Sequence, residues 1–255
     1  EKQADEFNKK KIIFINKKFF YRFFNKIFVL IEKFLKWIFL HSPRETFNIC
    51  YFGFDITKLK AYEEADIIHI HWLREGFISL KSLSKITKPV VWTMRDMWAF
   101  TGGPHYTLDF ENFEKTIFSK MIKDYKKKNY NDNFNFVAVS KWLMHKAQQS
   151  KVFKKYNLTH IPNNIDKSGF KIIDKKSAKR FLNINTNKQI ICYGSQNPQS
   201  KRKGWNIFIK SLEKLDKSKF FLLIFGNFWS HRALAEIGIE FKSLGYIKNN
   251  NVLSN

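Results

Sequence analysis

The chain has 255 residues, which is enough to bury one large hydrophobic core or two modest ones. Its formal net charge is +24, yet only seven of its 46 basic residues are arginine. Because nucleic-acid readout usually relies on the planar guanidinium group, this excess of lysine argues against a nucleic-acid-binding protein and favours the codon bias of an AT-rich genome, although the charge still attracts anionic surfaces and ligands.

The first predicted element is a helix within residues 12–40, a segment rich in aromatic side chains. Its basic residues mostly recur at spacings of three, four or seven, which places them in one narrow stripe: Lys18, Arg22, Lys26, Lys33 and Lys36. The longest uncharged run is too short for a bilayer, which needs about 20 apolar residues. Two interpretations stay open: peripheral contact with an anionic membrane, or a helix packed on the first domain with its basic stripe in water.

Alternating apolar and amphipathic segments predict an α/β fold. We expect strands at 47–52, 67–72, 90–94, 134–139, 158–162, 188–193, 220–225 and 241–247, and helices at 55–64, 77–86, 113–125, 141–149 and 205–215. Ser140 is the expected cap of the helix that it precedes. The two cysteines, Cys50 and Cys192, have neither disulfide nor metal-site spacing, which fits a reducing cytosol, so we expect a cytoplasmic protein.

Polar groups gather after the strand at 90–94: Thr93, Arg95 and Asp96, then residues 101–106 with a pair of glycines. Because parallel strands bind ligands at their carboxyl ends, this stretch predicts a site. His69 and His71 lie two residues apart and therefore face the same side of their strand. With His105 they could be imagined as a metal site, but no fourth ligand follows, so hydrogen-bonded histidines are favoured.

The order of these motifs resembles the N-terminal domain of glycosyltransferase family 4, in the branch that makes bacterial surface polysaccharides. The matching stretches are Asp66–Trp72, Gly76–Leu80, Lys88–Thr93, Asp96–Trp98, Phe100–Gly103, Ala138–Trp142 and Ile161–Asp166. Arg95 stands where the family has histidine; a guanidinium group donates hydrogen bonds but cannot accept a proton. The family's later paired glutamates have no match, so we expect a chain truncated at its C-terminal end. The family's opening glycine-rich loop has no match either, so we expect truncation at the N-terminal end too, with loss of that element alone as the alternative.

The resemblance implies two Rossmann-like domains of GT-B type, the second incomplete: an acceptor-side domain over 1–162 and a partial nucleotide-sugar donor domain over 163–255. It implies a retaining, hexosyltransferase-like enzyme that moves a sugar from a nucleotide-sugar donor to a polysaccharide or lipid-linked acceptor, with no metal or other cofactor. The alternative is a degenerate, non-catalytic member or a basic binding protein. Nucleic acid is not an expected partner, since no zinc spacing, helix-turn-helix or aromatic repeat is present.

Lys203 and Arg202 stand where a loop meets a predicted helix start, which already favours an anion. The alternative there is a solvated lysine-rich loop. The resemblance implies that this pair holds the donor diphosphate and stabilises the leaving group. The expected site residues are, for catalysis, Arg95 and Asp96; for the donor, Gly194, Ser195, Arg202, Lys203, Gly204, Gly226, Gly245 and Tyr246; and on the acceptor side, His71, Thr93, Gly102, Gly103 and His105.

Overall fold

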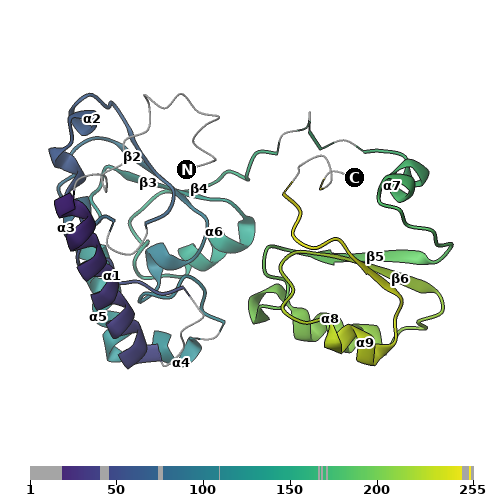
Figure 1. Cartoon of the computed structure of the whole chain (residues 1–255). Helices are drawn as coiled ribbons and strands as arrows, with labels where there is room; N and C mark the ends of the chain where they lie inside the picture. Colours follow the sequence, from purple (N-terminus) through teal and green to yellow (C-terminus); the bar gives the residue numbers. More distant parts are fainter. Residues whose placement is uncertain are drawn as a thin grey trace. The chain divides into compact units, whose positions relative to one another are not determined.

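The computed structural model describes residues 19–40, 46–73, 77–108, 110–165, 167, 169–170, 172–248 and 253. Two residues of the predicted motifs, Gly76 and Asp166, lie outside this part of the chain, as does Lys18 of the basic stripe. The contacts divide the chain into two compact units, residues 1–163 and 164–255. Both units contain a parallel sheet with helices, which confirms the predicted α/β class (Figure 1).

Unit 1 is built on a four-stranded parallel sheet in the order β1-β2-β3-β4. Its strands are β1 (Ile68–Ile70), β2 (Val90–Met94), β3 (Phe134–Ala138) and β4 (Leu158–His160). Trp92 of β2 pairs with Phe136 of β3, and both side chains are buried in the main core. The burial of β2 alternates along the strand, which places one face on the core and leaves Thr93 half-buried on the other face.

The helices of unit 1 are shorter than the sequence predicts. They are α1 (Phe19–Leu40), η4 (Ile56–Lys58), α2 (Lys60–Glu63), α3 (Leu80–Leu83), η5 (Trp98–Phe100), α4 (Glu111–Glu114), α5 (Ile117–Asn129) and α6 (Lys141–Gln148). The helix expected at 113–125 is divided because Thr116 caps α5, accepting a hydrogen bond from the Ser119 amide. Ser140 caps α6 as predicted, through the Leu143 amide.

The segment 47–52 is not a strand, contrary to the prediction. Phe47 forms a single bridge with Pro104, and Cys50 has a positive φ of 54°, a conformation that interrupts an extended chain. The amides of Ile49 and Cys50 donate instead to the two carboxylate oxygens of Glu32, at 2.7 and 2.8 Å. The buried carboxylate of Glu32 thus connects helix α1 to this segment by hydrogen bonds.

Helix α1 carries apolar residues on both of its faces. Glu32 and the half-buried Leu35 lie toward the unit, whereas the solvent face exposes large apolar side chains. These are Phe23, Leu30, Phe34, Trp37 and Ile38. Lys26 and Lys33 are exposed beside them. None of the helices that the structure describes is long and apolar enough to cross a membrane.

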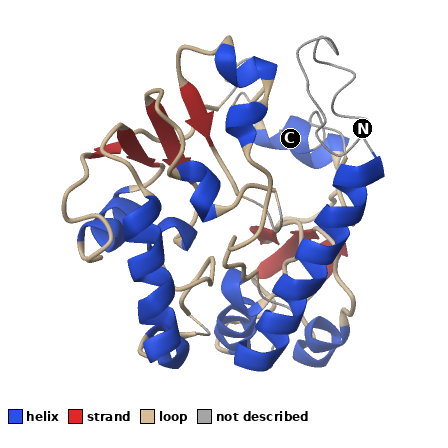
Figure 2. Ribbon diagram, turned by 90° about the vertical axis from the view of Figure 1, so that its left-hand side faces the viewer, coloured by secondary structure: helices blue, strands red, loops and turns tan. Residues whose placement is uncertain are grey.

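Unit 2 contains a three-stranded parallel sheet in the order β5-β6-β7. Its elements are α7 (Lys175–Phe181), β5 (Gln189–Gly194), η6 (Lys201–Lys203), α8 (Trp205–Glu213), β6 (Phe220–Phe225), α9 (Arg232–Ile237) and β7 (Phe241–Ser243). Leu222 and Ile224 of β6 face α8 and α9, which lie together on one side of the sheet, and Phe221 and Leu223 face the other side (Figures 1 and 2). Helices α7 and α9 are not predicted by the sequence pattern.

Candidate functional site

His105 is the centre of a buried polar cluster in unit 1. Its Nδ1 lies 2.7 Å from Asp96 Oδ2, and its Nε2 lies 2.5 Å from Asn48 Oδ1. The Asn48 amide nitrogen donates elsewhere, so its oxygen is the atom that faces the ring. Asp96 and Asn48 thus face the two ring nitrogens of His105, and the Trp72 indole N–H points at Nδ1 from 3.3 Å.

Asp96 is engaged through both of its oxygens. While Oδ2 faces His105, Oδ1 accepts a hydrogen bond of 2.9 Å from the Trp98 amide at the start of η5. The carboxylate therefore fixes the turn that follows β2, and its side chain is mostly buried. This geometry suits a residue that positions the site.

Lys126 of α5 holds the far end of the same turn. Its Nζ donates to the carbonyl oxygens of Trp98 and Thr101, and it lies 3.8 Å from the centre of the Trp98 ring. The side chain is completely buried, and this burial lowers the pKa of Lys126 to about 7. A neutral amine keeps two N–H groups, which is the number that these two carbonyls require.

Gly102 and Gly103 are needed for close packing. A side chain on Gly102 would overlap Ser119 of α5, and one on Gly103 would overlap the Phe47 ring. Gly103 also has a φ of 132°, a conformation that disfavours other residues. Both glycines and His105 are buried, so any acceptor-side role of these residues is exerted through the backbone that they support.

The solvent-facing part of this site comes from the carboxyl ends of β1 and β2. The His69 and His71 rings lie 4.1 Å apart, which confirms that they share one side of the strand, and His69 Nε2 lies 2.9 Å from Thr93 Oγ1. Arg95 donates to Asn163 Oδ1 at 2.8 Å. The pKa of His71 is lowered by partial burial and by the nearby His69 and Arg95, which favours its neutral form.

Two hollows adjoin these side chains. A narrow one is lined by His71, Arg95 and Asp96 together with η5, and a cavity of about 320 Å³ beside β1 is lined by His69, His71 and the end of the strand. Within the described residues, no group of three or more His, Cys, Asp or Glu side chains is arranged as a metal site.

In unit 2, three glycines meet at the carboxyl ends of the strands. The Gly226 amide donates to the Gly245 carbonyl at 2.7 Å. The backbone amide of Ser195, the residue after Gly194, donates to the Phe225 carbonyl at 3.3 Å. A side chain on Gly226 would overlap the Ser195 carbonyl oxygen, and one on Gly194 would overlap the Phe225 ring. The structure thus brings together three of the predicted donor-side glycines. Neighbouring atoms fill the space beside Gly194 and Gly226, whereas the space beside Gly245 is open.

The Tyr193 hydroxyl group contacts the loop between β5 and α8 at two points. Tyr193 donates to the carbonyl oxygens of Pro198 and Lys203, each at 2.9 Å. The hydroxyls of Ser195 and Ser200 are buried in this loop, and no described residue supplies a hydrogen-bond partner for either. Buried polar atoms are nearly always paired, so these two hydroxyls are suited to meeting a ligand or water.

Helix α8 begins directly after the predicted cationic pair. Arg202 and Lys203 are exposed in η6, and Gly204 then adopts a left-handed φ of 76° at the N-cap. No side chain caps α8, so the amides of its first turn remain available to an anion. Tyr246 lies just past Gly245 and is 49% exposed.

Comparisons with known proteins find similarity in fold only. No family model and no curated protein matches the sequence. The crystal structure of a glycosyltransferase from Rickettsia africae matches 99% of this chain and 59% of its own length, with 14% identity and a TM-score of 0.53. HepE of Anabaena, solved with UDP-glucose, matches over 74% of this chain and 51% of its own, at 15% identity and a TM-score of 0.47.

The first of these likenesses covers nearly the whole chain, and both units contain a parallel sheet. The chain therefore has a Rossmann-like fold of the GT-B type. It spans less than two thirds of each of these two structures.

Proposed function

We propose that this chain belongs to a nucleotide-sugar glycosyltransferase of the family 4 type, whose acceptor is a polysaccharide or a lipid-linked glycan. The glycosyltransferase fold supports this, and so does the motif order after β2. The observation that carries the proposal is the cradle in unit 2: three glycines at the strand ends, two unpartnered buried hydroxyls, and Arg202 and Lys203 ahead of an uncapped helix.

Each part of the cradle suits a nucleotide diphosphate. Open space beside Gly204 and Gly245 allows a bulky ligand to approach the backbone there, and the first-turn amides of α8 favour negative charge. Lys203 and Arg202 add two cations, which would also stabilise the charge that develops on the leaving diphosphate. The Ser195 and Ser200 hydroxyls would gain partners on binding.

On the acceptor side, we assign substrate contact to the exposed side chains. The buried side chains hold the exposed ones in place. His71, Thr93 and Arg95 face solvent or are half-buried, so they are able to contact the transferred sugar or the acceptor. Asp96 and His105 hold the turn behind them. A retaining course requires no protein base, because the leaving phosphate can take the acceptor proton, and Arg95 would then act by its charge alone.

The test is calorimetric titration of the chain with UDP and with UDP-glucose. Lys203→Ala is expected to weaken binding by about 1–3 kcal/mol, the scale of one charge-assisted hydrogen bond. Lys210→Ala is the matched control, because Lys210 is exposed on the same helix α8 but near its other end. Equal affinity of the two variants, or no nucleotide binding by the unaltered chain, would reject the donor assignment.

We also propose that α1 rests on an anionic membrane surface, where a lipid-linked acceptor would be found. Its solvent face exposes Phe34 by 58% and Trp37 by 66%. Apolar residues flanked by the exposed Lys26 and Lys33 have the composition of an interfacial helix, and the chain's net charge of +24 has the sign that anionic lipid attracts.

A further inference from the structure

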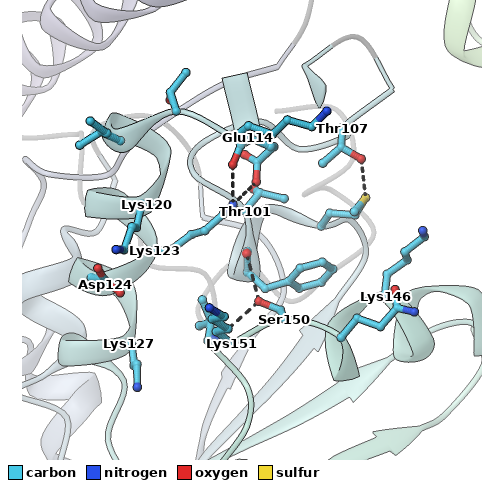
Figure 3. Close-up of a pocket in the computed structure, with 17 residues that line it drawn as sticks. Thr101, Thr107, Glu114, Lys120, Lys123, Asp124, Lys127, Lys146, Ser150 and Lys151 are labelled. Atoms are coloured by element: carbon cyan, nitrogen blue, oxygen red, sulfur yellow. Dashed lines mark hydrogen bonds and ion pairs between the residues drawn. The ribbon is translucent and has the colours of Figure 1, made fainter. Parts of the chain in front are cut away.

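A second cavity in unit 1 is strongly basic. It has a volume of about 570 Å³ and is lined by α5, by the end of α6 with the turn that follows, and by the segment after β2 (Figure 3). Six lysines and two carboxylates contribute to its lining: Lys115, Lys120, Lys123, Lys127, Lys146 and Lys151, with Glu114 and Asp124. Positive charge therefore predominates in a hollow that the proposed donor chemistry does not use.

Most of this charge is not neutralised. Lys123 pairs with Glu114 at 2.6 Å, and Glu114 is further occupied by the Gly102 amide at 2.8 Å. Among the described residues, the other five lysines form no ion pair, and all five are exposed. Their ammonium groups are therefore available to a ligand that carries several negative charges.

The base of the cavity is apolar. Met97, Phe100 and Val152 line it and are almost completely buried, whereas Ile117 at the rim is 81% exposed. Apolar side chains with polar groups around them are the usual lining of a small-molecule site, and the exposed Ile117 suits the C–H face of a sugar ring. Thr107 and Gln149 add uncharged polar groups to the lining.

The positions of the charges favour one class of anionic ligand over the others. Lys120 and Lys127 come from α5 at one side of the cavity, and Lys146 comes from α6 at the opposite side (Figure 3). Charges that are spread in this way fit a chain with repeated anionic groups better than a single phosphate. Single-stranded nucleic acid requires aromatic stacking platforms, but Phe100 is buried and packs against Phe153, with the ring centres 5.7 Å apart.

We propose that this cavity binds an acidic oligosaccharide, with its carboxylate or phosphate groups on the lysines and a sugar ring against the exposed Ile117. The helix η5 links this cavity to the candidate site, because Trp98 and Ala99 line the hollow beside Arg95 while Met97 and Phe100 line the lysine cavity. The idea that this oligosaccharide is part of the acceptor rests on the proposed function. The idea that the cavity binds an acidic oligosaccharide does not.

The experiment compares hexagalacturonate with the neutral maltohexaose by calorimetry, at low and at physiological salt. The chain is expected to bind the acidic oligosaccharide with an affinity that falls as salt rises, and to bind the neutral one at least about tenfold more weakly. The double variant Lys120→Glu/Lys151→Glu should reduce binding of hexagalacturonate by about tenfold or more.

The matched control is Lys81→Glu/Lys128→Glu, which changes the net charge equally at exposed positions outside the cavity. It is expected to retain most of the affinity. Lys146→Gln serves as a milder variant if charge reversal disturbs folding, which circular dichroism would reveal. UDP titration of the same proteins separates the two proposals, because neither pair of lysines lies in unit 2.

Three results would overturn the inference: equal binding of the neutral oligosaccharide, equal losses in the two double variants, or tighter binding of an oligonucleotide or of anionic vesicles through the same lysines. Binding of hexagalacturonate with no binding of UDP would leave this inference standing and reject the donor site. The reverse pattern would reject this inference alone.

Discussion

Arg95 and His71 form a pair whose electrostatic coupling can be measured directly. The pKa of His71 is lowered by burial first, and then by His69 and by the positive charge of Arg95. Removing that charge in Arg95→Gln is therefore expected to raise the pKa of His71. NMR titration of the histidine rings would show it. Arg180→Gln, an exposed arginine in unit 2, should leave this pKa unchanged. A pKa that stays the same or falls in Arg95→Gln would contradict the arrangement.

Lys126 makes a prediction about stability against pH. Its folded-state pKa is about 7 and its usual value is 10.5, so between these values the unfolded chain binds a proton that the folded chain has released. The free energy of unfolding should therefore rise with pH across this range, by at most about 1.4 kcal/mol per pH unit from this group, and gain nothing below pH 7.

Lys126→Met removes this dependence. Urea unfolding at pH 7, 8 and 9 should show a smaller rise in stability for Lys126→Met than for the unaltered chain. Lys128→Met, at an exposed position of the same helix, should behave like the unaltered chain. Identical pH dependence in all three proteins would mean that the Lys126 ammonium group is not desolvated as the structure indicates.

At the scale of elements, the exposed face of α1 makes a prediction about lipid. Phe34→Ser/Trp37→Ser removes two large apolar side chains from that face and should reduce co-sedimentation with anionic vesicles by about tenfold. Added salt should weaken the binding of the unaltered chain, because Lys26 and Lys33 interact with exposed headgroups.

The control for α1 is Leu108→Ser/Ile172→Ser, which removes two exposed apolar residues elsewhere in the chain. It should sediment with vesicles like the unaltered chain. Binding that is insensitive both to anionic lipid and to salt would contradict the membrane proposal.

A strand or helix could be predicted from the sequence where its residue pattern and its packing favour the same structure. Strand β2 begins and ends as predicted, because Val90–Met94 is β-branched and apolar and lies between two other strands. The strand expected at 47–52 is absent because a distant carboxylate, Glu32, takes the amides of Ile49 and Cys50. Helix α7 has no buried residue, so no apolar period could have predicted it.

The residues of the candidate site likewise fall into those that could be predicted from the sequence and those that could not. Arg95, Asp96 and the glycines could be found because they follow a strand in sequence. Asn48 and Lys126 could not, since they reach the turn from 48 and 30 positions away from Asp96, and only the tertiary structure brings them there. The one signal that could have found Lys126 is its position four residues after the apolar Ile122 on the same helix.

At the scale of the whole chain, the division into two units predicts where it can be cut. Residues 161–165 at the junction are exposed, and so is Lys167. Brief treatment with trypsin should cleave after Lys167 and leave two resistant fragments, to be identified by mass spectrometry. Lys126, which is fully buried, should be protected under the same conditions. First cleavage within residues 46–160 or 175–243, which contain the two sheets, would show that the units are less stable than their cores suggest.

The buried carboxylate of Glu32 limits how the chain can be divided. A membrane-contacting helix is often treated as a detachable module, one that can be deleted to obtain a better-behaved protein. Deleting α1 here would leave two buried amides at Ile49 and Cys50 without their acceptor, beside the Asn48 that supports His105. Each unsatisfied amide costs about 1–3 kcal/mol. In this protein the part that would touch lipid is also a structural member of unit 1, so a shortened version is expected to lose more than the proposed membrane affinity.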